Sequence, residues 1–167
     1  MHKKKIIIYE LNEVPKKLIN FYVNKNTLIP RPDTELLVEK ILKLGAERVV
    51  INTSAIMNKN LVGELVKEFG SSAVIVSLDI KKNLFGNYKL YHSAGKTKTN
   101  LSITEYLKFI EDQGVGEIFF QSIDNDGTYK GYDLELAKFI SNNTSVPIIP
   151  CGGCSSFENF NDLDTIC

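Results

Sequence analysis

The chain has 167 residues, which suits one domain with a buried core. Its twenty basic and twenty acidic residues cancel to a formal net charge of zero, so the composition predicts neither a nucleic-acid partner nor an anionic membrane surface. The basic opening is followed by only three isoleucines, too few for a signal-peptide core, and no later apolar run could span a bilayer. Three cysteines do not make a disulfide framework. We expect a soluble cytoplasmic protein.

Apolar runs alternate with amphipathic segments along the chain. The runs, in order, are KKIIIYE, RVVIN, SAVIVSLD, EIFFQSID and VPIIPCGG. Such near-continuous apolar runs favour strands buried on both faces. Helices are predicted over residues 58–69, 102–113 and 133–142, and the polar segment KKNLFGNYKLYHSAGKTKTN is predicted to be an excursion or a small hairpin. The alternation predicts a parallel α/β sheet, closed as a barrel or open.

Two of the predicted helices carry N-terminal capping signals. Ser102 and Glu105 have the spacing of a capping box, in which each side chain bonds the backbone of the other residue. Asp133 is a natural N-cap for the following helix, whose buried side is expected to contain Leu134, Ala137 and Ile140.

The loop SIDNDGTYKGYD, residues 122–133, partly fits the template of a calcium-binding loop. Asp124, Asp126, Gly127 and Asp133 fall at template positions 3, 5, 6 and 12. However, Ser122 stands where the first carboxylate is required, and the preceding residues have the composition of a strand rather than a helix. The loop is therefore predicted to connect a strand to a helix, and no metal ion is expected there.

The predicted strands end in polar or glycine residues that could build one site. In parallel α/β folds, ligands bind at the carboxyl ends of the strands. Those ends carry Asn52 and Thr53, then Asp79, then residues 124–127, and finally residues 151–153. A pocket assembled from four loops is the resulting prediction.

Two short motifs suggest other chemistry. Cys151 and Cys154, in CGGC, have the spacing of a dithiol or of half a zinc site, against the alternative of ordinary small residues in a loop. The stretch SAGKT is similar to a phosphate-binding loop of nucleotide triphosphatases, but Leu90 stands where the first glycine is required. Nucleotide triphosphate binding is therefore not expected.

Four stretches together resemble a known family. GAERVVINTSAI, GSSAVIVSLDIKK, GVGEIFFQSIDNDGTYKGYDLEL and VPIIPCGGCSSFENF, within about residues 45–160, resemble the cyclase subunit of imidazole glycerol phosphate synthase in order and spacing. The resemblance implies strands four to seven of a (β/α)8 barrel. It also implies a lyase of histidine biosynthesis that closes an imidazole ring on a bis-phosphorylated ribotide, using ammonia from a glutaminase partner subunit. The sequence SLDIKKNLFGNYKLY is also similar to a divergent branch of this family that is found in surface-polysaccharide pathways. No cofactor is implied.

The resemblance assigns roles to residues at the carboxyl ends of the strands. Asp79 matches a catalytic aspartate, and a carboxylate at a buried strand end can transfer protons if its pKa is tuned; the alternative is a solvated strand-end acid. The positions matched to substrate phosphates are Asn52, Thr53, Asp126, Gly127, Gly152 and Gly153. Glycines there would let backbone N–H groups approach an anion closely. Asp124, Gln121 and Cys151 are expected to line the same pocket.

Arg48 and Glu117 lie near the opposite ends of their predicted strands. They match two members of the charged gate through which ammonia enters the family's barrel. The alternative is an ordinary surface salt bridge, which contributes little to stability.

The chain also departs from the family. The family's second catalytic aspartate on strand one, its strands two and three, and its strand eight have no counterpart, and HSAGK carries an extra residue. Residues 21–44 resemble the entry segment of release-factor glutamine methyltransferases, without the glycine-rich loop and N-P-P-Y motif that methyl transfer needs, and residues 4–20 are similar to the start of an alkaline-phosphatase-like protein.

From these departures we expect two segments: a foreign βα unit over residues 1–44 and half a barrel over residues 45–167, in a truncated or chimeric gene product. The open edges and apolar interior of half a barrel predict self-association. Cyclase activity is expected to be defective in the isolated chain. The alternative function is a half-barrel that binds phosphates or a partner without turnover.

Overall fold

The computed structural model describes residues 38–43, 45–164 and 166. The predicted strand KKIIIYE and most of the 1–44 segment lie outside the described residues. Residues 38–43 are helical and bury Val38, Ile41 and Leu42 in the core. Within the described part of the chain, no helix is long and apolar enough to cross a membrane.

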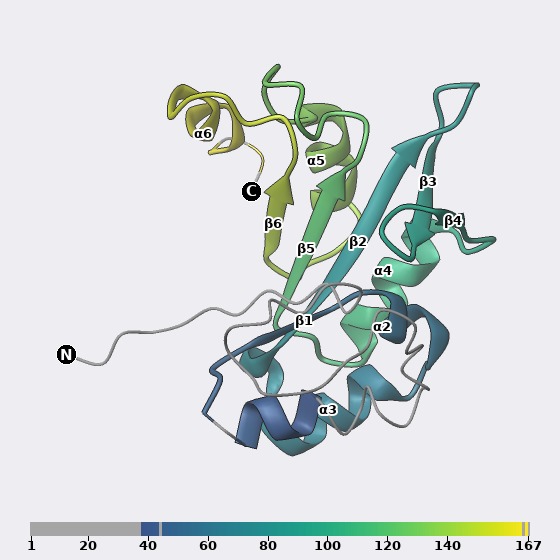
Figure 1. The fold of residues 1–167 in the computed structure, drawn as a ribbon, viewed down its shortest axis with the longest axis vertical. Helices are drawn as coiled ribbons and strands as arrows, with labels where there is room; N and C mark the ends of the chain where they lie inside the picture. The colour runs from purple at the N-terminus through teal and green to yellow at the C-terminus, as the bar shows by residue number, and fades with distance from the viewer. Residues whose placement is uncertain (1–37, 44, 165, 167) are drawn as a thin grey trace, which may run out of the picture.

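Four parallel strands form the body of one sheet (Figure 1). They lie in the order β1, β2, β5, β6, and each of the four corresponds to a predicted apolar run. Their bounds are β1 Val49–Ile51, β2 Val74–Lys82, β5 Glu117–Ser122 and β6 Ile148–Cys151. Consecutive parallel strands joined by helices are the arrangement found in part of a (β/α)8 barrel, so the predicted fold class is confirmed.

The predicted hairpin is also present. Strand β1 pairs only with the first residues of β2, so the same edge of β2 is open toward its carboxyl end. Strand β3, Tyr88–His92, pairs with that open part of the edge in the antiparallel sense. The two-residue strand β4, Thr97–Lys98, then pairs with β3. The hairpin therefore brings the residues that follow β3 back toward the carboxyl end of β1.

The three predicted helices are confirmed, with two local differences. The helices are α2 Thr53–Met57, α3 Leu61–Phe69, α4 Ile103–Asp112, α5 Leu134–Ser141 and α6 Glu158–Leu163, and a single 3-10 turn, η1, spans Ser71–Ala73. Ser102 is the N-cap of α4, but its side chain makes no capping hydrogen bond, so the capping-box prediction is wrong. The buried residue in the first turn of α5 is Leu136 rather than Leu134, which is 38% exposed. Leu136, Ala137 and Ile140 share one helical face, and Leu134 points away from it.

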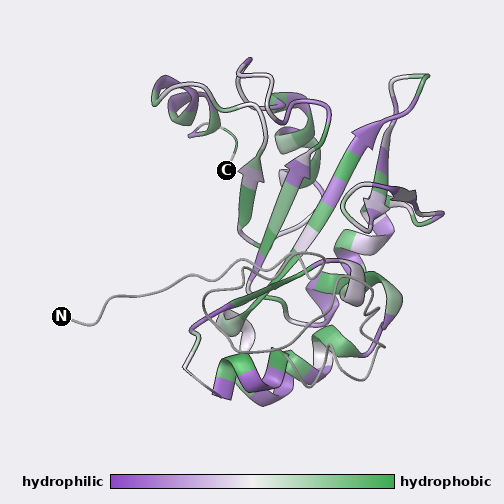
Figure 2. Ribbon diagram, viewed as in Figure 1, coloured by the Kyte–Doolittle hydropathy of each residue, from purple (hydrophilic) through white to green (hydrophobic). Residues whose placement is uncertain are grey.

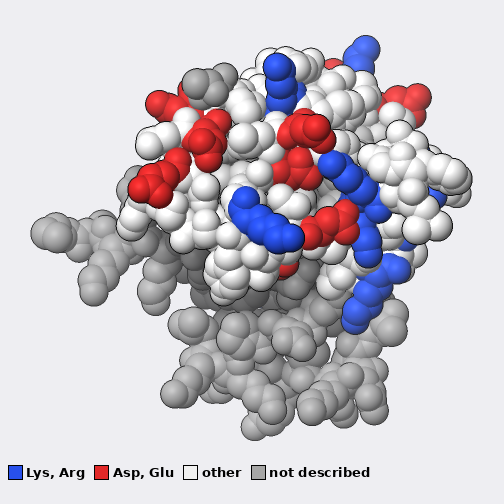
Figure 3. Space-filling model, turned by 90° about the horizontal axis from the view of Figure 1, so that it is seen from above, with Lys and Arg blue, Asp and Glu red and all other residues white. Residues whose placement is uncertain are grey.

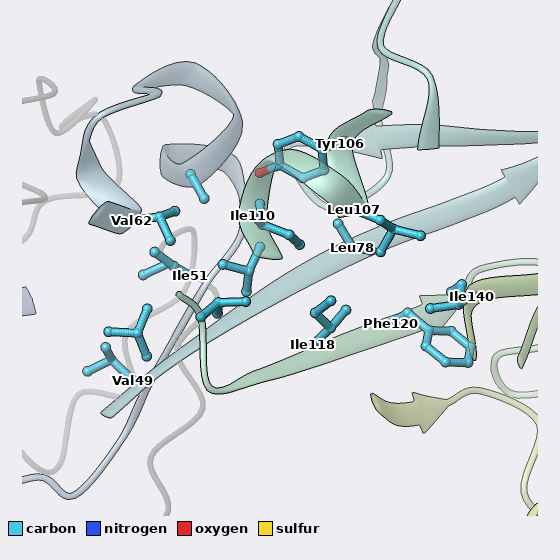
Figure 4. Packing of buried hydrophobic residues seen from close by; sticks show 14 of the residues in the cluster. Val49, Ile51, Val62, Leu78, Tyr106, Leu107, Ile110, Ile118, Phe120 and Ile140 are labelled. Atoms are coloured by element: carbon cyan, nitrogen blue, oxygen red, sulfur yellow. The ribbon is translucent and has the colours of Figure 1, made fainter. Parts of the chain in front are cut away.

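The main hydrophobic core lies on one face of the sheet. Val76 pairs with Ile118 and Leu78 with Phe120, so these side chains project to the same side, and all are almost fully buried. Residues of α4 and α5, including Leu107 and Ile140, pack against them (Figure 4). The helices carry their apolar residues on the side that meets this core (Figure 2). Each such side chain contributes roughly 1.5–3 kcal/mol through burial.

The opposite face of the sheet, which we name the site face, has a different composition. By strand register it carries Val50, Ile75, Ser77, Asp79, Phe119, Gln121, Ile149 and Cys151. On β2 this face is buried, as predicted. However, β5 alternates between buried and half-buried residues and β6 has no buried residue, so burial on both faces is wrong for β5 and β6. The reason is that described helices cover only the core side of β5.

Candidate functional site

The carboxyl ends of the parallel strands meet at one edge of the sheet. Asp79 of β2 pairs in register with Gln121 of β5, which pairs with Cys151 of β6, so the three side chains form a row on the site face. Asn52 directly follows β1 and reaches the same row through its side chain. Basic and acidic side chains are interspersed when the molecule is viewed onto this end (Figure 3). The structure therefore brings together residues that the sequence places up to 99 positions apart.

Asp79 is held by two hydrogen-bond donors. Its Oδ1 accepts from the Asn52 side-chain amide at 2.7 Å, and its Oδ2 accepts from the Gly95 backbone N–H at 2.9 Å. The residue is only 2% exposed. Burial raises the pKa of Asp79, while these two donors and the nearby His92 oppose that rise. A carboxyl group with a raised pKa in a fixed position is suited to proton transfer.

Asn52 uses only part of its hydrogen-bonding capacity. Its Nδ2 donates to Asp79, whereas its Oδ1 is buried and has no partner in the described residues. An amide nitrogen carries two protons, so one N–H remains for a ligand. The predicted phosphate role of Asn52 stays a prediction.

A turn between β3 and β4 closes over the ends of β1 and β2. Ser93, Ala94 and Gly95 all adopt positive φ, at 56°, 55° and 70°. The Ser93 N–H donates to Thr53 Oγ1 at 2.9 Å, and the Gly95 N–H donates to Asp79. Sequence reasoning missed this contact; the only signal was the extra residue in HSAGK.

The loop after β5 is tied to the ends of two strands. Asp124 Oδ2 accepts from the backbone N–H of Lys82, at 2.7 Å, which fixes the loop to the end of β2. Asp126 Oδ2 accepts from Gln121 Nε2 at 3.0 Å. The segment before the loop is the strand β5, so the predicted strand-to-helix connection is confirmed.

Two neighbouring loops contain glycines with positive φ, and different physical reasons require glycine in each loop. Gly127 has φ of 70° and open space around the position of a Cβ. Gly153 has φ of 89°, and a Cβ there would lie 2.1 Å from the Gly131 carbonyl oxygen; a Cβ on Gly152 would lie 2.6 Å from the Ser122 carbonyl oxygen. The backbone N–H groups of Gly127 and Gly153 make no hydrogen bond within the described residues. Gly153 is buried, and the role of both N–H groups in binding an anion stays a prediction.

The two cysteines of CGGC lie at the end of β6. Burial, followed by the charge of Asp126, raises the pKa of the Cys151 thiol, which keeps the reactive thiolate scarce. Cys154 donates weakly to the Ser156 carbonyl oxygen at 3.7 Å. Among the described residues, no group of three His, Cys, Asp or Glu side chains could hold a metal ion. A redox role stays untested.

Asp133 caps α5, as predicted, and also joins strand β3 of the hairpin to the start of α5. Its Oδ1 accepts from the Leu136 N–H at 3.0 Å and from the Tyr88 hydroxyl at 2.8 Å. Burial and the hydrogen bond to Asp133 raise the pKa of Tyr88 to about 12. The Lys82 ammonium lies 4.8 Å from the centre of the Tyr88 ring and 3.2 Å from Glu135. Sequence reasoning did not identify Tyr88.

Arg48 and Glu117 form an ion pair at the other end of the sheet. They come from β1's amino-terminal flank and the first residue of β5, so the pair crosses the start of β2. Their side chains are 36% and 24% exposed. The pair is observed, while its role as an ammonia gate stays a prediction.

Comparison with known proteins places the chain in a family. A sequence profile of the family described as "Histidine biosynthesis protein" matches residues 34–166. The imidazole glycerol phosphate synthase subunit HisF of Alkaliphilus metalliredigens is 38% identical over 125 residues, which cover 75% of this chain and 50% of the relative. The corresponding subunit of Sulfolobus acidocaldarius is 42% identical over 123 residues, covering 74% and 49%.

The chain spans about half the length of the curated relatives it matches. The predicted resemblance to this cyclase subunit is confirmed; the segment boundary between residues 44 and 45 stays a prediction. Because the profile covers most of the sequence, the chain belongs to the histidine biosynthesis protein family.

Proposed function

We propose that the chain carries out ring-closing chemistry of the imidazole glycerol phosphate synthase type. Its substrate would be a bis-phosphorylated ribotide, and a glutaminase partner subunit would supply ammonia. The observation that carries the proposal is Asp79, a buried carboxylate held by Asn52 and Gly95 beside free backbone N–H groups at the same strand ends. The relatives are named as subunits of that synthase, which supports both the reaction and a partner.

In this proposal Asp79 is the proton-transfer group. Ring closure and elimination require protons to be moved at the substrate, and a group acts best when its pKa approaches the working pH. Burial moves the pKa of Asp79 in that direction, since an aspartate in water ionises at much lower pH. The hydrogen bonds from Asn52 and Gly95 keep the carboxylate in one orientation, which favours transfer to a fixed substrate atom.

Backbone N–H groups would bind the phosphates. Gly127 and Gly153 offer unpaired N–H donors from adjacent loops, and glycine lets an anion approach the backbone without a side chain in between. Thr53 presents a hydroxyl at the next strand end. Asp126, bonded to Gln121, would orient its loop through the side chain, because its own backbone N–H already donates to the Ser122 carbonyl oxygen at 3.0 Å.

The Arg48–Glu117 pair would control entry at the opposite end of the sheet. The ion pair crosses the start of β2, at the amino-terminal end of the sheet, where a small neutral molecule would enter a barrel built from these strands. Breaking it would affect the use of ammonia delivered by a partner more than the use of free ammonia.

The second candidate function is phosphate binding without turnover. It is favoured because Asp79 is the single buried carboxylate in the described part of the chain, whereas acid–base ring closure uses two proton-transfer groups. Binding would need only the loop N–H groups. Both functions predict that the chain binds phosphate, but only the first predicts that it turns over a substrate.

Thermal unfolding with phosphate tests the binding step common to both. We expect inorganic phosphate or a bis-phosphate at millimolar concentration to raise the Tm, because a ligand that binds only the folded state stabilises it. Gly127→Glu should abolish the rise. Gly86→Glu is the matched control, since Gly86 also has positive φ and open surroundings but lies at the hairpin tip, and it should keep the rise. No shift in wild type, or equal shifts in both variants, would contradict phosphate binding.

A cyclase assay with saturating ammonia then separates the two functions. Turnover that disappears in Asp79→Asn supports the enzyme. Phosphate binding without turnover, in the chain alone and with a glutaminase subunit added, supports the binding protein. Turnover that Asp79→Asn leaves unchanged would remove Asp79 from the mechanism.

A further inference from the structure

We propose that the turn Ser93–Gly95 is a positioning element for Asp79, and that its docking depends on the charge of that carboxyl group. The proposal deepens the function above, because it rests on Asp79 being the proton-transfer group. It assigns a role to a segment outside the predicted site: the backbone N–H of Gly95 is one of the two donors that fix the carboxylate.

The turn contacts the ends of three parallel strands. Ser93 N–H bonds Thr53 beyond β1, Gly95 N–H bonds Asp79 of β2, and a Cβ on Gly95 would lie 2.6 Å from Cδ1 of Ile123, just after β5. Three successive residues with positive φ, two of them not glycine, form an unfavourable backbone that must be stabilised by its surroundings. These contacts supply that stabilisation and bring the Gly95 N–H to Asp79 Oδ2.

Docking of the turn is coupled to protonation of Asp79, because the Asn52 amide and the Gly95 N–H both need an acceptor on its carboxyl group. The ionised carboxylate accepts from Asn52 at one oxygen and from Gly95 at the other. When Asp79 takes a proton, one oxygen becomes a donor, and hydrogen bonds to the neutral acid are weaker than those to the carboxylate. The buried, unpaired Oδ1 of Asn52 can then accept that proton after the amide rotates. The Gly95 bond is therefore expected to be strong only while Asp79 is charged.

Other groups around Asp79 must be separated from this effect. His92 ends β3, accepts from or donates to Ser93 Oγ at 2.9 Å through Nδ1, and acts on Asp79 through its charge. On the site face, Asp79 lies beside Tyr91 of β3 and the uncharged Gln121 of β5. A His92→Gln variant removes the histidine titration while retaining Asp79.

The test follows backbone amide signals of the full-length, ¹⁵N-labelled protein during a pH titration, without substrate. The Gly95 signal is expected to move with the ionisation of Asp79, at a pH above the ordinary aspartate value. The movement should persist in His92→Gln and vanish in Asp79→Asn. Gly86 is the internal control, because its N–H bonds the Asn83 carbonyl in the other turn of the hairpin, and it should stay still.

Hydrogen exchange of the Ser93 amide tests the docking itself. Gly95→Ala adds a side chain at φ of 70° and places its methyl group 2.6 Å from Cδ1 of Ile123, so the turn and the Ile123 side chain must shift. The two effects together should accelerate exchange about tenfold, corresponding to the loss of about one hydrogen bond. Adding Ile123→Val removes Cδ1 and should slow the exchange again in part, because the strain of a positive φ at residue 95 remains. Gly86→Ala, with the same backbone strain in open space, should leave Ser93 unchanged.

Two results would overturn the proposal. One is a Gly95 signal that does not titrate, or that titrates equally in Asp79→Asn. The other is Ser93 exchange in Gly95→Ala equal to that in Gly86→Ala. Because neither measurement uses substrate or phosphate, either can fail while the proposed function holds, and the cyclase assay can fail while the turn still responds to Asp79. If Gly95→Ala does not fold, the titration of wild type and Asp79→Asn still decides.

Discussion

Gly153 and Gly127 lie in neighbouring loops of the proposed phosphate site, but alanine should be far more harmful at Gly153. Both glycines have positive φ, which costs a residue with a side chain about 1–2 kcal/mol. At Gly127 this is the whole cost, because nothing lies near the added methyl group. The expected destabilisation of Gly127→Ala is therefore about 1–2 kcal/mol.

At Gly153 a steric cost is added to the conformational one. The methyl group would lie 2.1 Å from the Gly131 carbonyl oxygen, and backbone atoms cannot yield as a flexible side-chain end can. Overpacking costs about 1–3 kcal/mol. The two loops must separate, which breaks the 2.8 Å bond from Gly131 N–H to the Gly153 carbonyl, worth about 1 kcal/mol. The total for Gly153→Ala is about 3–6 kcal/mol.

Thermal unfolding by circular dichroism measures the difference. For a chain of this length each kcal/mol lowers the Tm by about 2–4 °C, so Gly153→Ala should unfold at least roughly 5 °C below Gly127→Ala. A Gly131→Ala variant does not relieve the contact, because the opposing atom is backbone. Equal Tm values for the Gly153 and Gly127 variants would refute the argument that close backbone approach fixes the glycine at 153.

Three further predictions concern charge and association. Asp79 has a raised pKa in the folded chain, so its contribution to stability is present below the unfolded pKa and is lost as pH rises through the folded pKa. Asp79→Asn should therefore gain Tm relative to wild type as pH rises above the ordinary aspartate pKa of about 4, and a difference in Tm that stays constant with pH would contradict this. A double-mutant cycle of Arg48→Met and Glu117→Gln should give a coupling of about 0.5–1 kcal/mol in urea unfolding, and no coupling would show that the pair contributes nothing. Ile149, part-exposed on the site face of β6, should support self-association in sedimentation experiments, which Ile149→Lys should weaken; a monodisperse monomer in wild type would exclude association.

Local sequence signals predicted the four parallel strands and the start of α5 correctly. The apolar runs became β1, β2, β5 and β6, and Asp133 caps α5 because its side chain bonds a backbone N–H three residues away. The prediction failed where one residue had to be placed on a helix face, as with Leu134. It also failed for β5 and β6, because an apolar run does not reveal how many layers cover the strand.

The sequence by itself determined which residues lie at the carboxyl ends of the strands, because each end is marked by a change from apolar to polar residues. It also determined the family, through several motifs in order. Only the tertiary structure decided their partners: Asn52 and Gly95 on Asp79, Lys82 on Asp124, and Tyr88 on Asp133. These contacts join residues 16 to 45 positions apart. They depend on strand register and on a turn with positive φ, and a shift of one residue in either would point the donor to the other face.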